Sequence, residues 1–232
     1  MTAREDRPME QRSGASTAFG ASLAEYSRDL YARGWMPGTS GNLSVRLPDD
    51  GGHTALITAS GRDKGELTAE DMVAVHATTG DVLVPGPLRA SAETSIHTAV
   101  YRATDARAVI HVHSPYATVM ACRTGERDRT AVLPLDRFEL LKGLGLDDPA
   151  RTELPVFRNW PEVRRIADEA AAYLAAHPDA PPGLLIADHG ITTWGRDLAQ
   201  ARNRLECLEA ICQLLVLGAR DAPTDVKETV NR

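Results

Sequence analysis

The 232-residue sequence contains only three cysteines, Cys122, Cys207 and Cys212, and no CxxC pair. An odd number of cysteines without a paired framework is typical of a reducing compartment. Cys207 and Cys212 lie five residues apart on an expected helix, where they are poorly placed to bridge. The sequence therefore argues against a disulfide-stabilised extracellular domain.

Long hydrophobic runs are also missing. No segment approaches the roughly 18 apolar residues that a bilayer-spanning helix requires. The N-terminal residues include Arg4 and Arg7, but no apolar stretch typical of a signal peptide follows them. We therefore expect a cytoplasmic protein without a membrane partner.

Positive charge is not in excess. The chain has 26 Lys and Arg residues against 32 Asp and Glu residues, a net charge of −6. Nucleic-acid binding depends on neutralising phosphates with basic side chains, so nucleic acid is not expected as a partner. A small anion could still bind in a local cationic pocket.

What is present is an ordinary globular composition, with 43% hydrophobic and 25% charged residues. Helical and strand patterns alternate irregularly, and hairpin-like pairs occur, such as residues 72–76 with residues 82–84. This order predicts a single α/β domain with a largely antiparallel central β-sheet flanked by helices. We expect that domain over residues 17–222, between a disordered tail at 1–16 and a flexible tail at 223–232.

The sharpest local signal is His111-Val112-His113 in an expected strand over residues 107–113. Alternate residues of a strand share a face, so Ile110 and Val112 should enter the core and both imidazoles should point the other way. Two imidazoles on one rigid strand provide half of a zinc site, which needs three or four ligands. The alternative is two unrelated surface histidines.

His189 is a candidate for the third ligand. It lies in an Asp-His-Gly turn between two short apolar strands, a position that exposes a side chain to a cleft. The alternative is a turn histidine without a partner. His97, four residues after Glu93, suggests only a helical pair.

Two loops of small residues, 37–42 and 59–64, suggest an anion site. Glycines let backbone N–H groups approach an anion, and hydroxyl groups and Lys64 add further donors. Ser91, at an expected helix N-terminus, offers a third contribution. Neither loop has a Walker A or GxGxxG pattern, and each could be a plain turn.

Two carboxylates could act as an acid or a base. Glu93 occupies the first turn of an expected helix, where it could simply stabilise the helix dipole. Glu139 lies among apolar residues in the segment FELLKG, where desolvation could favour a general base. By pattern alone, an exposed helical face is the better interpretation of Glu139.

Five motifs in order give the chain a specific resemblance: TSGNLS (39–44), ITASG (57–61), SAE (91–93), VIHVHS (109–114) and DHGITTWG (188–195). Together they resemble the class II aldolase family, which includes epimerases and adducin heads. The resemblance implies a nine-stranded antiparallel sheet, a homotetramer and one divalent metal per subunit, usually Zn²⁺ although another first-row metal is possible. The ligands it implies are His111, His113 and His189. The phosphate-binding residues it implies are Ser40, Gly41, Asn42, Ser60, Gly61 and Ser91.

Within this family, the segments RGWMPGTSGNLS, ASGRDKG, SAETSIHTAVYR and FELLKG most closely resemble the methylthioribulose-1-phosphate dehydratase branch. That resemblance implies a hydro-lyase of methionine salvage, a sugar-phosphate substrate and Glu139 as the catalytic acid/base. In the aldolases, the residue equivalent to Glu93 has the leading role, and Glu93 is included here among the substrate-binding residues. A sugar-phosphate aldolase, a pentulose-phosphate 4-epimerase and a non-catalytic adducin-like module remain the alternatives.

Overall fold

One mixed sheet forms the centre of this computed structural model, which describes residues 9–48, 50–126 and 129–218. Within these residues the sheet has eight strands in the order β3-β2-β1-β4-β8-β7-β6-β5. All neighbouring pairs are antiparallel except β6 and β7, so the predicted largely antiparallel sheet is confirmed. The strands are β1 Asn42–Arg46, β2 Thr54–Thr58, β3 Met72–His76, β4 Ala108–Val112, β5 Ala131–Asp136, β6 Arg151–Phe157, β7 Gly183–Ile186 and β8 Gly190–Gly195.

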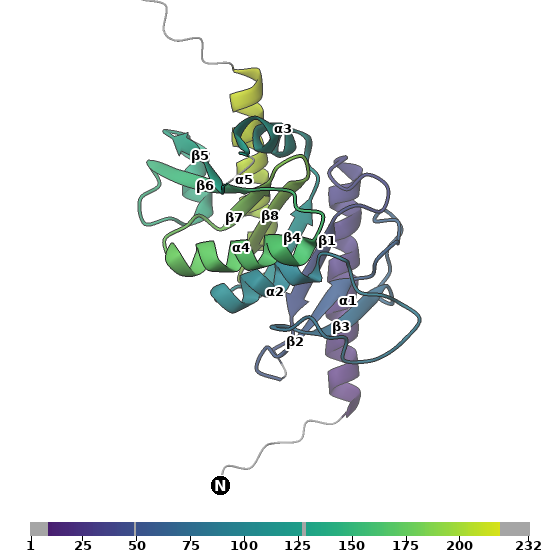
Figure 1. Cartoon of the computed structure of the whole chain (residues 1–232). Helices are drawn as coiled ribbons and strands as arrows, with labels where there is room; N and C mark the ends of the chain where they lie inside the picture. The colour runs from purple at the N-terminus through teal and green to yellow at the C-terminus, as the bar shows by residue number, and fades with distance from the viewer. Residues whose placement is uncertain (1–8, 49, 127–128, 219–232) are drawn as a thin grey trace, which may run out of the picture.

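Helices cover both faces of the sheet, as Figure 1 shows. One face carries α2 and α4, which pack against each other, and the opposite face carries α1, α3, α5 and the 3₁₀ helix η1. The helices are α1 Met9–Ala32, α2 Thr94–Ala103, α3 Pro115–Thr124, η1 Glu139–Leu144, α4 Val163–Ala176 and α5 Leu198–Leu217. None of the described helices has the length and apolar character needed to cross a membrane.

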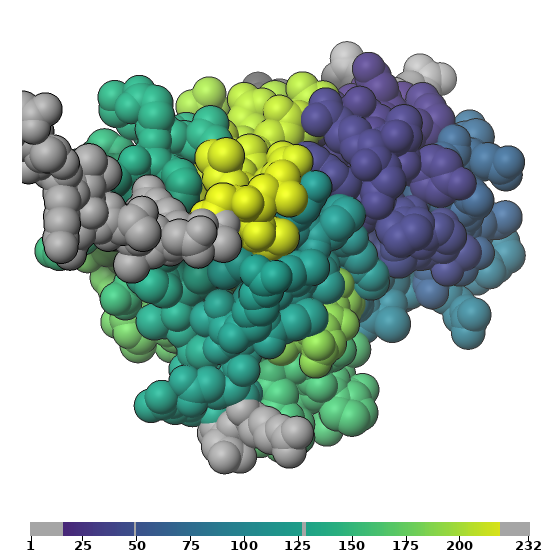
Figure 2. All heavy atoms as spheres, turned by 90° about the horizontal axis from the view of Figure 1, so that it is seen from above, coloured from purple at the N-terminus to yellow at the C-terminus, as the bar shows by residue number. Residues whose placement is uncertain are grey.

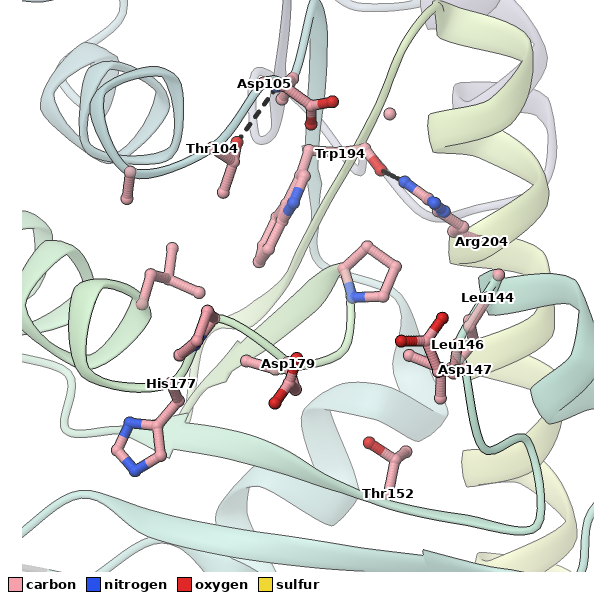
Figure 3. Close-up of a pocket in the computed structure, with 18 of the residues that line it drawn as sticks. Thr104, Asp105, Leu144, Leu146, Asp147, Thr152, His177, Asp179, Trp194 and Arg204 are labelled. Atoms are coloured by element: carbon pink, nitrogen blue, oxygen red, sulfur yellow. Dashed lines mark hydrogen bonds between the residues drawn. The ribbon is translucent and has the colours of Figure 1, made fainter.

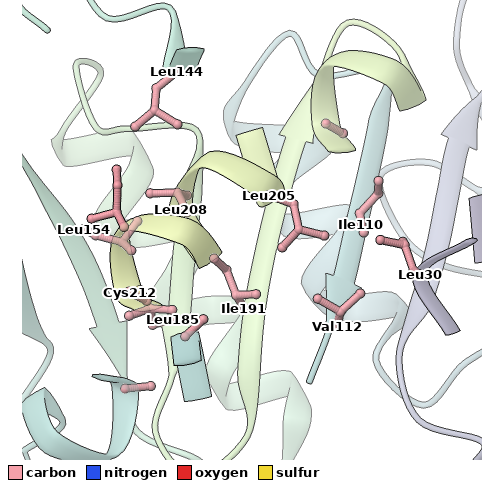
Figure 4. Close-up of a cluster of buried hydrophobic side chains, with 14 of the residues drawn as sticks. Leu30, Ile110, Val112, Leu144, Leu154, Leu185, Ile191, Leu205, Leu208 and Cys212 are labelled. Atoms are coloured by element: carbon pink, nitrogen blue, oxygen red, sulfur yellow. The ribbon is translucent and has the colours of Figure 1, made fainter. Parts of the chain in front are cut away.

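The central strand β4 separates two hydrophobic cores. Ile110 and Val112 enter the core that contains Leu30 of α1 and Leu205 of α5 (Figure 4). Val109 faces the opposite core, beneath α2 and α4. The predicted inward direction of Ile110 and Val112 is therefore confirmed, and His111 lies on the other face of the strand.

Three expectations need correction. The resemblance implied nine strands, whereas the described residues form eight. Residues 82–84 do not form a strand, because only an isolated bridge joins Val82 to Val75. Helix α1 begins at Met9, so residues 9–16 are helical rather than part of a disordered tail. The expected tail segments 1–8 and 223–232 lie outside the described residues.

The apolar stripe predicted over residues 198–215 lies on α5. Five of its six side chains are buried against the sheet, and Leu215 is partly buried. Cys212 is one of the five, whereas Cys207 is only partly buried and Cys122 is exposed. All three thiols are free.

A buried carboxylate of α5 fixes the start of α3. Ser114 is the N-cap residue of α3, but its side chain does not cap the helix. Instead, Glu209 accepts hydrogen bonds from Ser114 Oγ at 2.8 Å and from the backbone N–H groups of Tyr116 and Ala117 at 2.9 and 2.8 Å. A carboxylate at a helix N-terminus satisfies free donors and interacts favourably with the helix dipole. In Figure 2 the C-terminal end of α5, in yellow, lies beside teal side chains from the middle of the sequence.

We expect Glu209→Ala to lower the free energy of unfolding by about 3 kcal/mol, because it leaves buried donors without an acceptor. Urea unfolding at a fixed protein concentration measures the loss. Glu206→Ala is the matched control on the same helix, because the ion pairs of Glu206 with Arg33 and Arg202 are partly exposed to solvent. Its expected cost is below about 1 kcal/mol. Equal losses in the two variants would contradict this account of α3.

Candidate active site at the end of the central strands

Three imidazoles meet where β4 ends and β8 begins. His111 is the fourth residue of β4, His113 directly follows that strand, and His189 lies in the turn between β7 and β8. The ring centroids are 5.2 Å apart for His111 and His113, 4.9 Å for His111 and His189, and 4.6 Å for His113 and His189. The structure thus brings together the three histidines that the sequence singled out.

The geometry of the β7–β8 turn places His189. Asp188 has a positive φ of 56°, which tightens the turn. The next residue, Gly190, approaches β4 so closely that a Cβ atom there would lie 2.2 Å from the Val112 carbonyl oxygen. Only glycine allows this approach, which holds His189 beside His113.

Glu93 completes the cluster from the N-cap position of α2. Its Oε1 lies 2.7 Å from His189 Nε2, and its Oε2 lies 3.4 Å from His111 Nε2. The four residues each offer a ligand atom within 4.8 Å of the others. Glu93 and the histidines therefore form a group that can hold a metal ion.

Unpartnered nitrogens show that this group fits a metal ion. His111 Nδ1 lies 2.9 Å from Thr192 Oγ1, which leaves Nε2 facing the cluster. His111 Nε2, His113 Nε2 and His189 Nδ1 are buried and make no hydrogen bond. Buried polar atoms without partners are rare in native proteins unless an ion or water satisfies them. A second contact on the far ring nitrogen, as Thr192 provides, is typical of metal-binding histidines.

The protonation states also suit a metal ion. Burial lowers the pKa of His111 to about 4, and burial likewise lowers the pKa of His113. Near pH 7 both rings are neutral, which is the form that donates a lone pair. Burial opposes ionisation of Glu93, yet nearby His111 and His189 and the Asn42 amide hold its pKa well below the usual range. The cluster therefore combines the neutral rings of His111 and His113 with a carboxylate anion.

The predicted anion-binding segments lie side by side. Lys64 Nζ donates to the Thr39 carbonyl at 2.8 Å and to the Arg62 carbonyl at 2.9 Å, which joins the two glycine-containing loops. An isolated bridge between Ala59 and Ala90 joins the second loop to the segment that carries Ser91. The three segments, distant in sequence, thus form one surface beside the histidine cluster.

Lys64 is the least expected member of this surface, because its side chain is only 1% exposed. Burial lowers its pKa, while the carboxylates of Asp63 and Glu93 act in the opposite direction. In the part of the chain that the structure describes, Lys64 forms no ion pair. Two of its three N–H donors bind carbonyl groups, so one donor remains for an anion.

Several of the other predicted anion-binding residues already form hydrogen bonds within the protein. Ser40 Oγ donates to the Pro37 carbonyl at 2.7 Å, and Ser91 Oγ accepts from the Glu93 N–H at 3.2 Å. Gly41 and Gly61 have φ values of 75° and 72°, which glycine adopts readily. Ser60 is half-buried, with its backbone N–H bound to the Arg89 carbonyl at 2.8 Å.

Asn42 and Glu139 differ in burial and in their contacts with the cluster of Glu93 and the three histidines. The Asn42 side chain is buried, and its amide contacts Glu93 and His97. Glu139 begins η1, where its side chain is 82% exposed and lies 2.8 Å from Lys142 Nζ. Within the described residues, no hydrogen bond or ion pair joins Glu139 to the histidine cluster.

Sequence reasoning missed several contributors to the site. His97, Ser44 and Tyr101 form a buried polar group behind Glu93, and Thr192 contacts His111. The signal for His97 was its four-residue spacing from Glu93, which places both at one face of α2. No sequence signal pointed to Ser44 or Thr192, because their role depends on which strands are neighbours.

A cavity of about 950 Å³ lies at the opposite end of the sheet from the histidines. Figure 3 shows Trp194, Asp179 and Arg204 around it, with Arg204 donating to the Trp194 carbonyl at 2.8 Å. None of the predicted site residues lines this cavity. The chemistry of the histidine cluster is thus separate from it.

Comparison with known proteins agrees with the geometry. The model of the class II aldolase and adducin N-terminal domain family matches residues 21–216. This chain belongs to that family. Class II aldolases depend on a metal, and the group formed by Glu93 and the three histidines is able to bind one.

Sequence relatives within the family include dehydratases. The chain is 56% identical over 202 residues to a probable bifunctional methylthioribose-1-phosphate isomerase/methylthioribulose-1-phosphate dehydratase of Nocardia farcinica. That match covers 87% of this chain but only 36% of the relative, so the chain spans about a third of that protein. It is also 41% identical to the methylthioribulose-1-phosphate dehydratase of Sorangium cellulosum, with 87% of this chain and 94% of the relative covered.

Solved structures in the class II aldolase family share the fold. An L-fuculose 1-phosphate aldolase superposes with a TM-score of 0.71 at 26% identity, covering 88% of this chain and 87% of that one. A putative aldolase/epimerase/decarboxylase from Klebsiella pneumoniae also gives 0.71, at 27% identity and with 89% and 93% covered. The described fold is therefore that of a class II aldolase domain.

Proposed function

We propose that the chain is a metal-dependent hydro-lyase that converts 5-methylthioribulose 1-phosphate to 5-methylthio-2,3-diketopentyl 1-phosphate in methionine salvage. The observation that carries this proposal is the 41% identity to a dehydratase of similar length, which exceeds the 26% identity to an aldolase of the same fold. The proposal places the enzyme in the cytoplasm as a homotetramer. Its substrate is a sugar phosphate, and neither nucleic acid nor membrane is a partner.

His111, His113 and His189 are the proposed ligands of one Zn²⁺ per subunit. Their unpartnered buried nitrogens and the neutral state of His111 and His113 support this role. When bound, the ion supplies Lewis-acid polarisation of the substrate carbonyl oxygen. Three imidazoles also suit other first-row metals, so Zn²⁺ is the first metal to test.

The chain itself orients the substrate. Lys64, the Ser40-Gly41 and Ser60-Gly61 turns and Ser91 hold the phosphate, with Asn42 at the inner end of the first turn. The joined loops and the free donor of Lys64 support this assignment. Holding the phosphate at one end fixes the carbon that faces a carboxylate, which removes much of the entropic cost of reaction.

A carboxylate must then take the C3 proton and help the C4 hydroxyl group to leave. We assign this acid/base role to Glu139 and place Glu93 beside the substrate. Because Glu139 is exposed and outside the cluster of its own chain, it acts in this proposal at the site of a neighbouring subunit. The homotetramer is thus part of the active site rather than a separate property.

Turnover of the proposed substrate tests the function directly. The Zn²⁺-loaded protein should form the diketone phosphate from methylthioribulose 1-phosphate, and a chelator should abolish turnover until Zn²⁺ is restored. Product formation is followed by absorbance and mass spectrometry. Carbon–carbon cleavage without dehydration would instead favour the aldolase alternative.

Metal analysis of variants accompanies that assay. His111→Ala, His113→Ala and His189→Ala should each lose most of the bound Zn²⁺ while the fold remains. His177→Ala is the control, because His177 is exposed and contacts the Tyr173 carbonyl. Full metal content in all three cluster variants would overturn the ligand assignment.

Lys64→Met should raise KM for the sugar phosphate by about 10- to 100-fold, with a smaller effect on kcat. The physical reason is the loss of a charged donor that holds the phosphate equally in the ground and transition states. Arg129→Met is the control, because Arg129 is exposed and its described ion pair is with Glu126, which has no part in the proposed site. An unchanged KM in a folded Lys64→Met protein would remove Lys64 from the phosphate site.

Subunit mixing tests Glu139. Glu139→Gln and His113→Ala should each be inactive, but oligomers assembled from both should recover roughly a quarter of the wild-type rate, because random assembly in a closed oligomer pairs intact groups of two chains. A mixture of His111→Ala with His113→Ala should recover nothing, because one chain supplies all the ligands. Normal activity of Glu139→Gln alone would transfer the acid/base role to Glu93.

A further inference from the structure

A buried chain of hydrogen bonds leads from Glu93 into the interior. Asn42 Nδ2 donates to Glu93 Oε2 at 2.5 Å, and Asn42 Oδ1 lies 2.6 Å from His97 Nε2. Beyond His97, its Nδ1 lies 2.7 Å from Ser44 Oγ, which lies 2.7 Å from the Tyr101 hydroxyl group. Apart from Glu93, every member is at most 3% exposed.

The chain joins two elements at matching intervals. Asn42 and Ser44 are two apart on β1 and therefore share a face of the sheet. Glu93, His97 and Tyr101 follow one another at four-residue steps along α2 and therefore share a face of the helix. The two rows interlock, so β1 and α2 contribute alternate members.

Only one pattern of donors satisfies every contact. The Asn42 amide oxygen can only accept, so His97 Nε2 must carry a proton and donate to it. Burial lowers the pKa of His97 to about 3, so the ring is neutral and its Nδ1 accepts. Ser44 must then donate to Nδ1, and Tyr101 must donate to Ser44. Each donor therefore points along the chain toward the Glu93 carboxylate.

The alternative orientation of Asn42 is unfavourable. Turning its amide over would place the amide oxygen against the ionised carboxylate of Glu93, where neither oxygen can donate a hydrogen bond. Hydrogen bonds that point in one direction also polarise one another, which strengthens the bond to the charged end. The carboxylate of Glu93 thus determines which atom of Asn42 faces the site, and the rest of the chain follows from that orientation.

We propose that Asn42, His97, Ser44 and Tyr101 are positioning residues that hold Glu93 Oε2 and keep its carboxylate aimed at the three histidines. His97 is the central member, because its tautomer sets the direction of the whole chain. With Oε2 held by Asn42, the carboxylate cannot rotate freely, and Oε1 remains on the side of His189. The effect on catalysis rests on the proposed function, whereas the direction of the chain does not.

Nuclear magnetic resonance of ¹⁵N-histidine-labelled, metal-free protein tests the direction without any substitution. The ¹⁵N shifts of His97 should report a neutral ring with the proton on Nε2, and Zn²⁺ loading should leave that tautomer unchanged. Ser44→Ala should shift the His97 signals, because Nδ1 loses its donor. Thr193→Val is the matched control, a buried strand hydroxyl that bonds the Ala201 carbonyl instead. A proton on Nδ1, or a charged ring near pH 7, would overturn the proposal.

Kinetics test the effect on Glu93. His97→Phe should lower kcat about 10- to 100-fold, the loss expected when a hydrogen bond to a charged group is removed. KM and Zn²⁺ content should stay near wild type, because His97 forms its described hydrogen bonds with Asn42 and Ser44 and not with Lys64 or the three histidines. His97→Gln should retain most of kcat, because its amide N–H can replace the Nε2 donor.

Equal losses in His97→Gln and His97→Phe, or a loss of Zn²⁺ in parallel with kcat, would show a merely structural role. If His97→Phe does not fold, Ser44→Ala provides the same comparison and should lower kcat with KM unchanged. If the wild-type protein does not dehydrate the sugar phosphate, the proposed function fails, but the His97 tautomer still tests the direction of the hydrogen-bond chain. If the protein does dehydrate the sugar phosphate and His97 carries its proton on Nδ1, the proposed function stands and the positioning role fails.

Discussion

The register of β4 with its two neighbours is the constraint on which the site depends. Asn42 on β1, His111 on β4 and Thr192 on β8 are cross-strand partners in one row of the sheet. Each therefore points to the face that carries α2, where the Glu93 carboxylate lies. A slip of one residue would turn His111 into the core that holds Ile110 and Val112, and the cluster would be lost.

Burial of charge explains how the parts of the site depend on one another. An isolated carboxylate is costly away from water, so Glu93 requires the Asn42 amide and the neighbouring histidines. Lys64 presents the opposite case, a buried ammonium group held by two carbonyl groups and attracted by Glu93. The loops joined by Lys64 and the cluster of Glu93 with the three histidines therefore place a buried positive charge close to a buried negative charge.

The two glutamates illustrate the difference between a residue type and its environment. The sequence around Glu139 left desolvation open but favoured an exposed helical face, and in the structure Leu141 and Leu144 take up the buried side of η1 and leave the carboxylate exposed. Glu93, with polar neighbours in sequence, lies beside three histidines instead. In the proposed function Glu139 therefore acts from a second subunit, whereas Glu93 lies beside the histidines of its own chain.

The sequence by itself determined the local features. Alternation along β4 predicted which of its side chains enter the core, the stripe on α5 predicted its buried face, and the glycine after His189 marked a tight turn. These follow from periods of two and 3.6 residues and from backbone sterics, which act over a few positions. The ordered motifs added the family, but not the contacts inside the site.

Only the tertiary structure decided the long-range contacts. Asn42 meets Glu93 across 51 positions, and Glu209 caps α3 from more than 90 positions away. Such contacts depend on strand order and helix placement, for which a single sequence carries no local pattern. The spacing of Glu93 and His97 was visible in the sequence, but the β1 side chains that join them were not. The physical reason is that a buried polar group takes its partner from whichever element the fold packs against it.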